Sequence, residues 1–216
     1  MILRGVIEHT FGGALCFRGF AKIGDLAKIS QSKDTYQREA DKERSNEILD
    51  FLINSEFRFF PELIFGLSFE DTNAINDILS GKSKTFSDKI SFAFYKKDYN
   101  DYNASNKYDS PLLRRIALDF KDESIKYLSR IDGNHRLTAI DIVLDNINKY
   151  SSSNTKNNDE DNNDEENKRI NEEVKKTINA LDYLVPFNIV LQSKNEESER
   201  FETAYFHLIN SKSKKL

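Results

Sequence analysis

The sequence predicts an α/β protein with an α+β mixed sheet, and three observations carry this prediction. Segments with the two-residue period of strands alternate along the chain with segments that have the 3.6-residue period of helices. The 216 residues are enough to bury a core as one domain without disulfides or a structural metal. No apolar run approaches the roughly 20 residues that a membrane helix needs. We therefore expect one domain over residues 1–216 that does not enter a membrane.

The first part of the chain predicts one strand and one helix. The N-terminal residues are extended or looped, and a turn signal at 11–14 precedes a short strand over 15–20. A turn and a short element follow at 24–29. Apolar residues recur at helical spacing between charged ones over 39–54, which predicts a helix there.

The middle of the chain predicts strands with one short helix between them. Continuous apolar residues over 63–67 indicate a buried strand. A short helix over 71–79 ends before a glycine. Alternating apolar residues then predict strands over 90–95 and near the end of 111–120, on either side of a polar loop.

The last part predicts a strand over 125–128 that runs into a polar turn at 131–136, and a helix that begins near Asn134. The apolar face of this helix is formed by Leu137, Ile140, Leu144 and Ile147. The remaining predicted elements are an amphipathic helix over 168–181, an apolar strand over 185–191 and a helix over 197–209.

One local segment sets the charge of the chain. Its net charge is −4, but residues 157–166 hold six acids and no base, and without them the net charge is +2. Residues 151–166 have no apolar side chain, so we predict a disordered acidic insertion within the domain. The near-neutral remainder neither supports nor excludes a nucleic-acid partner.

Cysteine and histidine usage excludes several classes of protein. Cys16 is the only cysteine, which rules out a disulfide framework and a Cys-rich zinc module. His9 and His207 have no cysteine or histidine at metal-ligand spacing, so no zinc site is predicted. Without a secretory pattern at the start, we expect a cytoplasmic protein.

The densest polar cluster is Asp132-Gly133-Asn134-His135-Arg136, between the predicted strand and helix. Gly133 can take a positive φ in a tight turn, and the backbone N–H groups at the helix start can bind an anion. Arg136 can grip a phosphate in two places, and His135 can donate to the same phosphate or act as acid or base. Asp132 can hold Mg²⁺ or orient the arginine.

The same residues also fit an ordinary helix start. Asp132 is then a helix cap, and His135 and Arg136 form a surface pair.

A second polar cluster, Tyr36-Gln37-Arg38, has two interpretations as well. Arg38 can join Arg136 around one phosphate while Gln37 contacts a base or ribose, or both can belong to a solvated helix N-terminus.

Four blocks resemble the DGQHR domain, in the same order along the chain. Asp132-Gly133-Asn134-His135-Arg136-Leu137 is similar to its signature, with Asn134 where that family usually has glutamine. Tyr36-Gln37-Arg38 looks like its N-terminal motif, and Phe59-Phe60-Pro61-Glu62 looks like its Phe-Phe-Pro step. Residues 206–216 resemble its C-terminal segment. The resemblance covers about residues 20–216, apart from the acidic insertion.

This resemblance implies a ParB/sulfiredoxin-like fold and a role in DNA modification or restriction (phage defence), as in DndB-like and DpdB-like proteins. It implies a nucleotide-phosphate site with Asp132, His135 and Arg136 as catalytic residues. Leu137-Thr138 also matches the related domain of GmrSD-type restriction enzymes. The residues expected to bind the nucleotide are Gln37, Arg38, Gly133, Asn134 and Thr138.

Two departures from the pattern limit what the resemblance implies. Sulfiredoxins have a cysteine immediately before the His-Arg pair, whereas Asn134 stands here, so we do not expect sulfinic-acid reduction. The chain also stops soon after Asn210, where DndB-like proteins continue into a helical region. Either the chain is a compact relative or it is a piece of a longer protein, so DNA binding by such a region is in doubt.

Three functions remain open at this point. The first is an enzyme that binds and hydrolyses a nucleoside triphosphate (ATP, GTP or CTP), with Mg²⁺ near Asp132. The second is a DNA-binding regulator without turnover, aided by Lys212, Lys214 and Lys215. The third is a protein-interaction domain that has lost the site. Expected partners are a nucleotide, DNA, other defence-system proteins and a second copy in a homo-oligomer.

Overall fold

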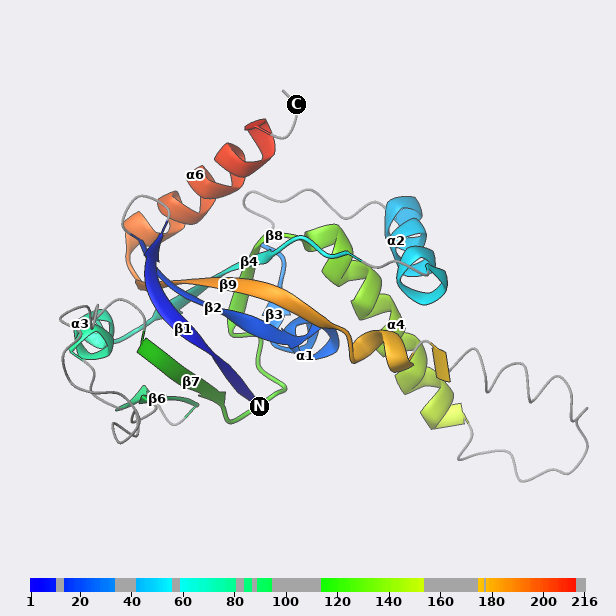
Figure 1. Cartoon of the computed structure of the whole chain (residues 1–216), viewed down its shortest axis with the longest axis horizontal. Helices are drawn as coiled ribbons and strands as arrows, with labels where there is room; N and C mark the ends of the chain where they lie inside the picture. The colour runs from blue at the N-terminus through cyan, green and yellow to red at the C-terminus, as the bar shows by residue number, and fades with distance from the viewer. Residues whose placement is uncertain are drawn as a thin grey trace, which may run out of the picture.

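The computed structural model is a mixed α/β structure built on one large sheet (Figure 1). It describes residues 1–10, 14–33, 42–55, 59–80, 84–86, 89–94, 114–153, 175–176 and 178–212. The combination of one mixed sheet with helices confirms the predicted α/β (α+β mixed sheet) class. Within these residues the sheet has nine strands in the order β3-β8-β4-β9-β2-β1-β7-β6-β5.

Antiparallel neighbours form one half of the sheet. A hairpin of β1 (Ile2–Thr10) and β2 (Ala14–Lys22) is extended on one side by β7 (Arg114–Phe120), β6 (Ile90–Phe94) and β5 (Lys84–Phe86). On the other side β2 pairs with β9 (Leu184–Ser193), also antiparallel.

Parallel pairs appear in the other half of the sheet, which carries the predicted site. Here β4 (Leu63–Phe69) runs parallel to β9 and antiparallel to β8 (Leu128–Asp132). The short edge strand β3 (Ser30–Gln31) runs parallel to β8. The uninterrupted apolar run that predicted a buried strand is β4, in which six of the seven residues are buried.

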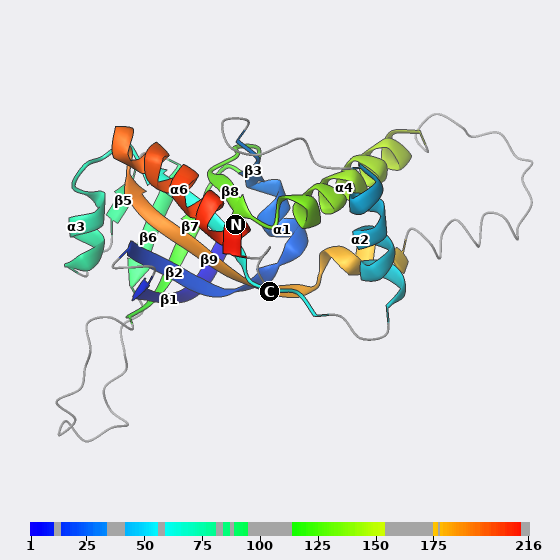
Figure 2. The same cartoon turned by 90° about the horizontal axis from the view of Figure 1, so that it is seen from above.

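Helices cover the two faces of the sheet differently. The helices α1 (Ile23–Lys28), α2 (Lys42–Asn54) and α4 (Asn134–Ser153) pack together on one side, and α6 (Glu196–Lys212) lies apart from them, as Figure 2 shows. The short helix α3 (Ala74–Leu79) packs against the end of β9.

Alternation along β8 shows that α6 and α4 lie on opposite faces of this strand. Ser129 and its neighbour Gly66 lie beside Glu202 of α6, whereas Arg130 bonds to Asp141 of α4. Successive side chains of a strand point to opposite faces. We call the side that carries α1 and α4 the helix face, and the side that carries α6 the outer face.

The hydrophobic core lies on the helix face of the sheet, between the strands and the helices that cover them. Its largest fully buried side chains include five phenylalanines: Phe17, Phe65, Phe92, Phe120 and Phe187. The apolar stripe predicted for α4 is confirmed, because Leu137 and Ile140 are buried and Leu144 packs against the core. Rings of Phe17 and Phe187 meet edge to face across neighbouring strands, with centroids 5.3 Å apart.

Several predicted boundaries differ from the observed ones. The prediction of a strand over 125–128 is wrong, because β8 begins only at Leu128. The ring of Tyr127 packs on Phe120, with centroids 4.9 Å apart, and Asp122 accepts bonds from Ser124, so these residues form a turn. Helix α4 reaches Ser153, three residues into the predicted insertion at 151–166, and the rest of that insertion lies outside the described residues.

Candidate functional site at the turn between β8 and α4

A bulge and a glycine shape the turn that the sequence singled out. Ile64 of β4 pairs with Asp132 and the next residue, Phe65, pairs with Arg130, so Ile131 is an extra residue in β8. Bulges of this kind bend a strand and redirect its side chains. Gly133 follows with φ +88°, a conformation that costs other residues energy, and α4 starts at Asn134.

Arg136 holds the turn together. Its Nη2 donates to Asp132 Oδ2 at 3.1 Å, its Nη1 donates to the carbonyl of Pro61 at 2.7 Å, and its guanidinium lies 5.7 Å from the centroid of the Phe60 ring. Burial lowers the pKa of Arg136, and the charge of Asp132 partly opposes that shift. Two of the blocks that carry the family resemblance, 59–62 and 132–137, are therefore in direct contact.

Asn134 and His135 present buried polar atoms at the start of α4. Neither Asn134 Oδ1 nor His135 Nδ1 has a hydrogen-bond partner among the described residues. A buried polar atom without a partner costs about 1–3 kcal/mol, and native structures contain few of them. Two in adjacent residues mark this turn as a place where a ligand can supply the missing bonds.

Three predicted site residues remain, and the structure describes only one of them, Thr138. Thr138 is half-buried on α4, one turn after Asn134 and on the same side of the helix. Gln37 and Arg38 lie outside the described residues. Lys33, the last described residue before them, bonds to the buried carboxylate of Glu202 in α6 at 2.7 Å.

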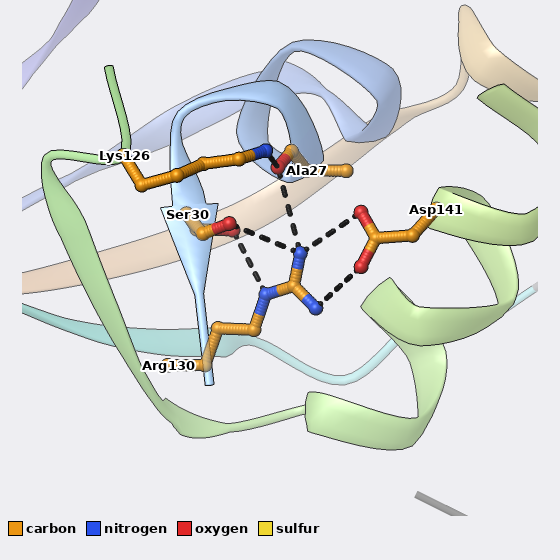
Figure 3. Close-up of polar contacts among 5 residues, drawn as sticks. All are labelled: Ala27, Ser30, Lys126, Arg130 and Asp141. Atoms are coloured by element: carbon orange, nitrogen blue, oxygen red, sulfur yellow. Dashed lines mark hydrogen bonds and ion pairs between the residues drawn. The ribbon is translucent and has the colours of Figure 1, made fainter. Parts of the chain in front are cut away.

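A second arginine cluster, which the sequence did not indicate, lies across β8 on the helix face (Figure 3). Arg130 forms a two-pronged ion pair with Asp141, with bonds of 2.8 and 3.1 Å. It also donates to the hydroxyl and carbonyl oxygens of Ser30. Because each of its three guanidinium nitrogens bonds to a protein oxygen, Arg130 joins α4 to the segment after α1 and has a structural role.

A third cluster, also missed, lies on the outer face beside Pro61. Arg18 of β2 bonds to Glu8 at 2.7 Å and to Glu62 at 2.6 and 2.9 Å, and Asn188 of β9 donates to Glu62 at 3.4 Å. One signal was available in the sequence, since Asn188 interrupts an otherwise apolar predicted strand. Glu62 belongs to the Phe-Phe-Pro-Glu block, which the sequence did not predict to be part of the functional site.

The described residues offer no ready metal site. They contain no group of three His, Cys, Asp or Glu side chains arranged to hold an ion. Asp132 is the carboxylate proposed for Mg²⁺, but its Oδ2 accepts from Arg136. The turn therefore does not fit a metal held by the protein alone. Its chemistry is that of N–H donors, one carboxylate and two buried side-chain atoms that have no partner among the described residues.

Comparisons with protein-family models, with curated proteins and with solved structures found no match to this chain. In the parts of the chain that the structure describes, no helix is long and apolar enough to cross a membrane. Fold and site together define a mixed α/β protein whose polar strand-to-helix turn is held by one arginine.

Proposed function

We propose that the turn between β8 and α4 binds the phosphate groups of a nucleotide. The observation that carries this proposal is the buried Nδ1 of His135, which has no hydrogen-bond partner among the described residues and lies at the start of a 20-residue helix. The Oδ1 of Asn134, which also lacks a partner there, is an acceptor and suits a ribose hydroxyl of the same nucleotide. The first N–H groups of a helix attract anions, and its macrodipole adds a partial positive charge there.

Each residue of the turn has a separate part in this proposal. His135 donates from Nδ1 to a phosphate oxygen, and Asn134 Oδ1 accepts from a ribose hydroxyl. Arg136 supplies positive charge: its bonds to Pro61 and Asp132 use two of the five N–H donors of a guanidinium. Gly133 permits the turn, and Asp132 orients Arg136.

The proposed activity at this site is hydrolysis of a nucleoside triphosphate. Arg136 then stabilises the negative charge that develops on the phosphate, and His135 acts as acid or base. Mg²⁺ in such a reaction arrives bound to the nucleotide phosphates, since the turn alone does not fit a metal.

The biological setting is proposed from the sequence resemblance. A DGQHR-type protein with the ParB/sulfiredoxin-like fold belongs to DNA modification or restriction, with DNA and other defence-system proteins as partners. The alternative is a DNA-binding regulator without turnover. A salt-dependent gel shift without nucleotide hydrolysis favours the regulator, because phosphate contacts weaken steeply as salt rises.

Calorimetry with ATP, GTP, CTP and inorganic tripolyphosphate, each with and without Mg²⁺, tests the proposed binding site. We expect binding by the wild type and a loss of at least tenfold in affinity for His135→Ala and Arg136→Ala, each of which removes one charged or polar contact to phosphate. A thermal shift on adding ligand provides the second readout.

His9→Ala is the matched control for His135→Ala. His9 is an exposed histidine of β1, four strands away from β8 in the sheet order. We expect it to bind every ligand as the wild type does. If none of these ligands binds the wild type, or if both turn variants bind as tightly as it does, the phosphate site is disproved.

A further inference from the structure

The outer face of the sheet carries a polar cluster whose charge does not suit a phosphate. Arg18 contributes one positive charge against the two carboxylates of Glu8 and Glu62, both of which accept hydrogen bonds from it. These bonds raise the pKa of Arg18. These three side chains together carry one surplus negative charge, and the oxygens of the two carboxylates favour a ligand group that donates hydrogen bonds.

The sheet register places this cluster next to the phosphate-binding turn. Asp132 pairs with Ile64, Ile64 with Asn188, and Asn188 with Arg18. Residues directly opposite one another on neighbouring strands point to the same face. Asp132, Asn188 and Arg18 therefore share the outer face across four adjacent strands. Pro61 completes the connection, because its carbonyl bonds to Arg136 and the next residue is Glu62.

Asn188 provides the observation that points to a ligand. Its side chain is buried, with 1 % of the residue exposed, and its Oδ1 has no hydrogen-bond partner among the described residues. Its Nδ2 donates to Glu62 Oε2, so the amide points into the cluster. A buried amide oxygen next to a carboxylate is a place that lacks a donor.

An aromatic ring lies beside the cluster. Phe20 follows Arg18 by two residues in β2, so both side chains are on the outer face, and Phe20 is 68 % exposed. Phe59, three residues before Glu62, is 80 % exposed. Exposed aromatic rings near a polar edge are the usual stacking partners of nucleobases.

We propose that this cluster is the base subsite of the nucleotide site, and that it selects a base with an exocyclic amino group. The base stacks on Phe20, and its amino group donates to Glu62 and to Asn188 Oδ1. Carboxylate and amide oxygens accept from such groups in the recognition of cytosine and adenine. This proposal rests on the proposed function, since the phosphates of the same nucleotide occupy the turn at Asn134–Arg136.

The test compares nucleotides that differ at the amino group. Calorimetry measures the affinity of the wild type for CTP against UTP and for ATP against ITP, with tripolyphosphate as the ligand without a base. We expect CTP and ATP to bind about tenfold more tightly than UTP and ITP, because a site left with an unpaired buried acceptor rejects the analogue. Tripolyphosphate is expected to bind more weakly than CTP and ATP.

Three variants separate the base subsite from the phosphate site. Glu62→Gln should reduce the preference for CTP over UTP to less than threefold. Phe20→Ala should weaken every nucleotide about tenfold through lost stacking and leave tripolyphosphate unchanged. Glu70→Gln is the control: it neutralises an exposed glutamate that lies outside the cluster, after the other end of β4, where it bonds to Lys194, so it should keep the preference. Melting temperatures confirm that each variant is folded.

The outcomes distinguish the two proposals. If tripolyphosphate binds but wild-type protein treats CTP, UTP, ATP and ITP alike, the base subsite is disproved and the phosphate site stands. The same conclusion follows if Phe20→Ala weakens tripolyphosphate as much as it weakens the nucleotides. If neither nucleotides nor tripolyphosphate bind, both proposals fail together.

Discussion

Arg130 and Arg136 lie on either side of one bulge, and each pairs with an aspartate, yet their surroundings differ. Arg130 points to the helix face, where Asp141, Ser30 and the carbonyl of Ala27 surround its guanidinium, at distances of 2.8 to 3.5 Å. Arg136 lies at the turn, where it makes one bond to Asp132 and one to the carbonyl of Pro61 and lies over the ring of Phe60.

The difference teaches how one kind of ion pair can serve two purposes. All the donors of Arg130 face protein groups, and its side chain is closed to solvent, so it can only join elements together. Arg136 keeps donors for other partners and lies beside two polar atoms without partners. Packing around each arginine therefore separates a fully enclosed structural pair from one whose guanidinium keeps donors for further partners.

Removing Arg130 should cost the most stability. Arg130→Ala leaves Asp141 without its charged partner and leaves two oxygens of Ser30 without a donor, and we expect a loss of about 3 kcal/mol in the free energy of unfolding. The partial exposure of Asp141 keeps the loss below that of a fully buried pair. Urea unfolding followed by circular dichroism measures it.

Arg136→Ala is the matched comparison on the other side of the bulge. We expect it to cost only about 1 kcal/mol, because Asp132 and Pro61 remain accessible to water. Arg130→Lys should recover part of the loss at its own position, since a lysine keeps the charge but not the two-pronged geometry. Equal losses of stability for the two alanine variants would mean that Arg130 and Arg136 contribute equally to the fold.

Gly133→Ala should destabilise the turn itself by about 2 kcal/mol. A Cβ at this position meets Cδ2 of Leu63, and the φ of +88° is strained for any residue with a side chain. Combining it with Leu63→Ala in a double-mutant cycle measures how much of the cost is the clash and how much is backbone strain. An alanine variant as stable as the wild type would mean that the turn has another conformation.

The smallest expected effect is a pH dependence of folding stability that comes from Lys126. Burial lowers the pKa of Lys126, and Arg130 lowers it further, while Asp141 and Asp145 oppose the shift. Because the unfolded chain binds this proton more tightly than the folded one, this group makes stability rise as pH increases through the lysine range. The gain is a few tenths of a kcal/mol, since the side chain is largely exposed and screened by solvent.

Urea unfolding of the wild type and of Lys126→Met at pH 8 and pH 10.5 isolates this contribution. We expect the stability of the wild type relative to the variant to improve at the higher pH. Lys28→Met, which alters an exposed lysine in the last turn of α1, is the control and should show no such trend. A relative loss of wild-type stability at pH 10.5 would reverse the sign and refute the assignment.

Local patterns predicted most of the elements around the site. The apolar spacing of Leu137, Ile140 and Leu144 anticipated both α4 and its buried face, and the apolar run beginning at Leu63 anticipated β4. The short strands β3 and β5 were not predicted, because two or three residues carry no period and depend on their partners in the sheet. Strand β8 was placed too early because Tyr127 packs on Phe120 instead of continuing a strand.

The site was predicted only in part, for the same reason. Arg136 and the Phe60-Pro61 step were recognised as separate motifs, but their contact joins residues 75 positions apart. Arg18, Glu62 and Asn188 come from three different strands, so no window of sequence contains them together. Arg130 carried no sign that it was buried, because a charged residue at the end of a strand is usually exposed.

The sequence by itself determined the mixed α/β class, the turn at Gly133 and the helix that follows it. These depend on side chains a few residues apart, whose spacing and backbone preferences are visible in the chain. Tertiary structure decided which arginine is buried and which lies by the turn, and it placed Glu62 and Asn188 beside Arg18. Burial and ion pairing depend on the whole set of neighbours in space, and strands distant in sequence supply those neighbours only once the sheet has formed.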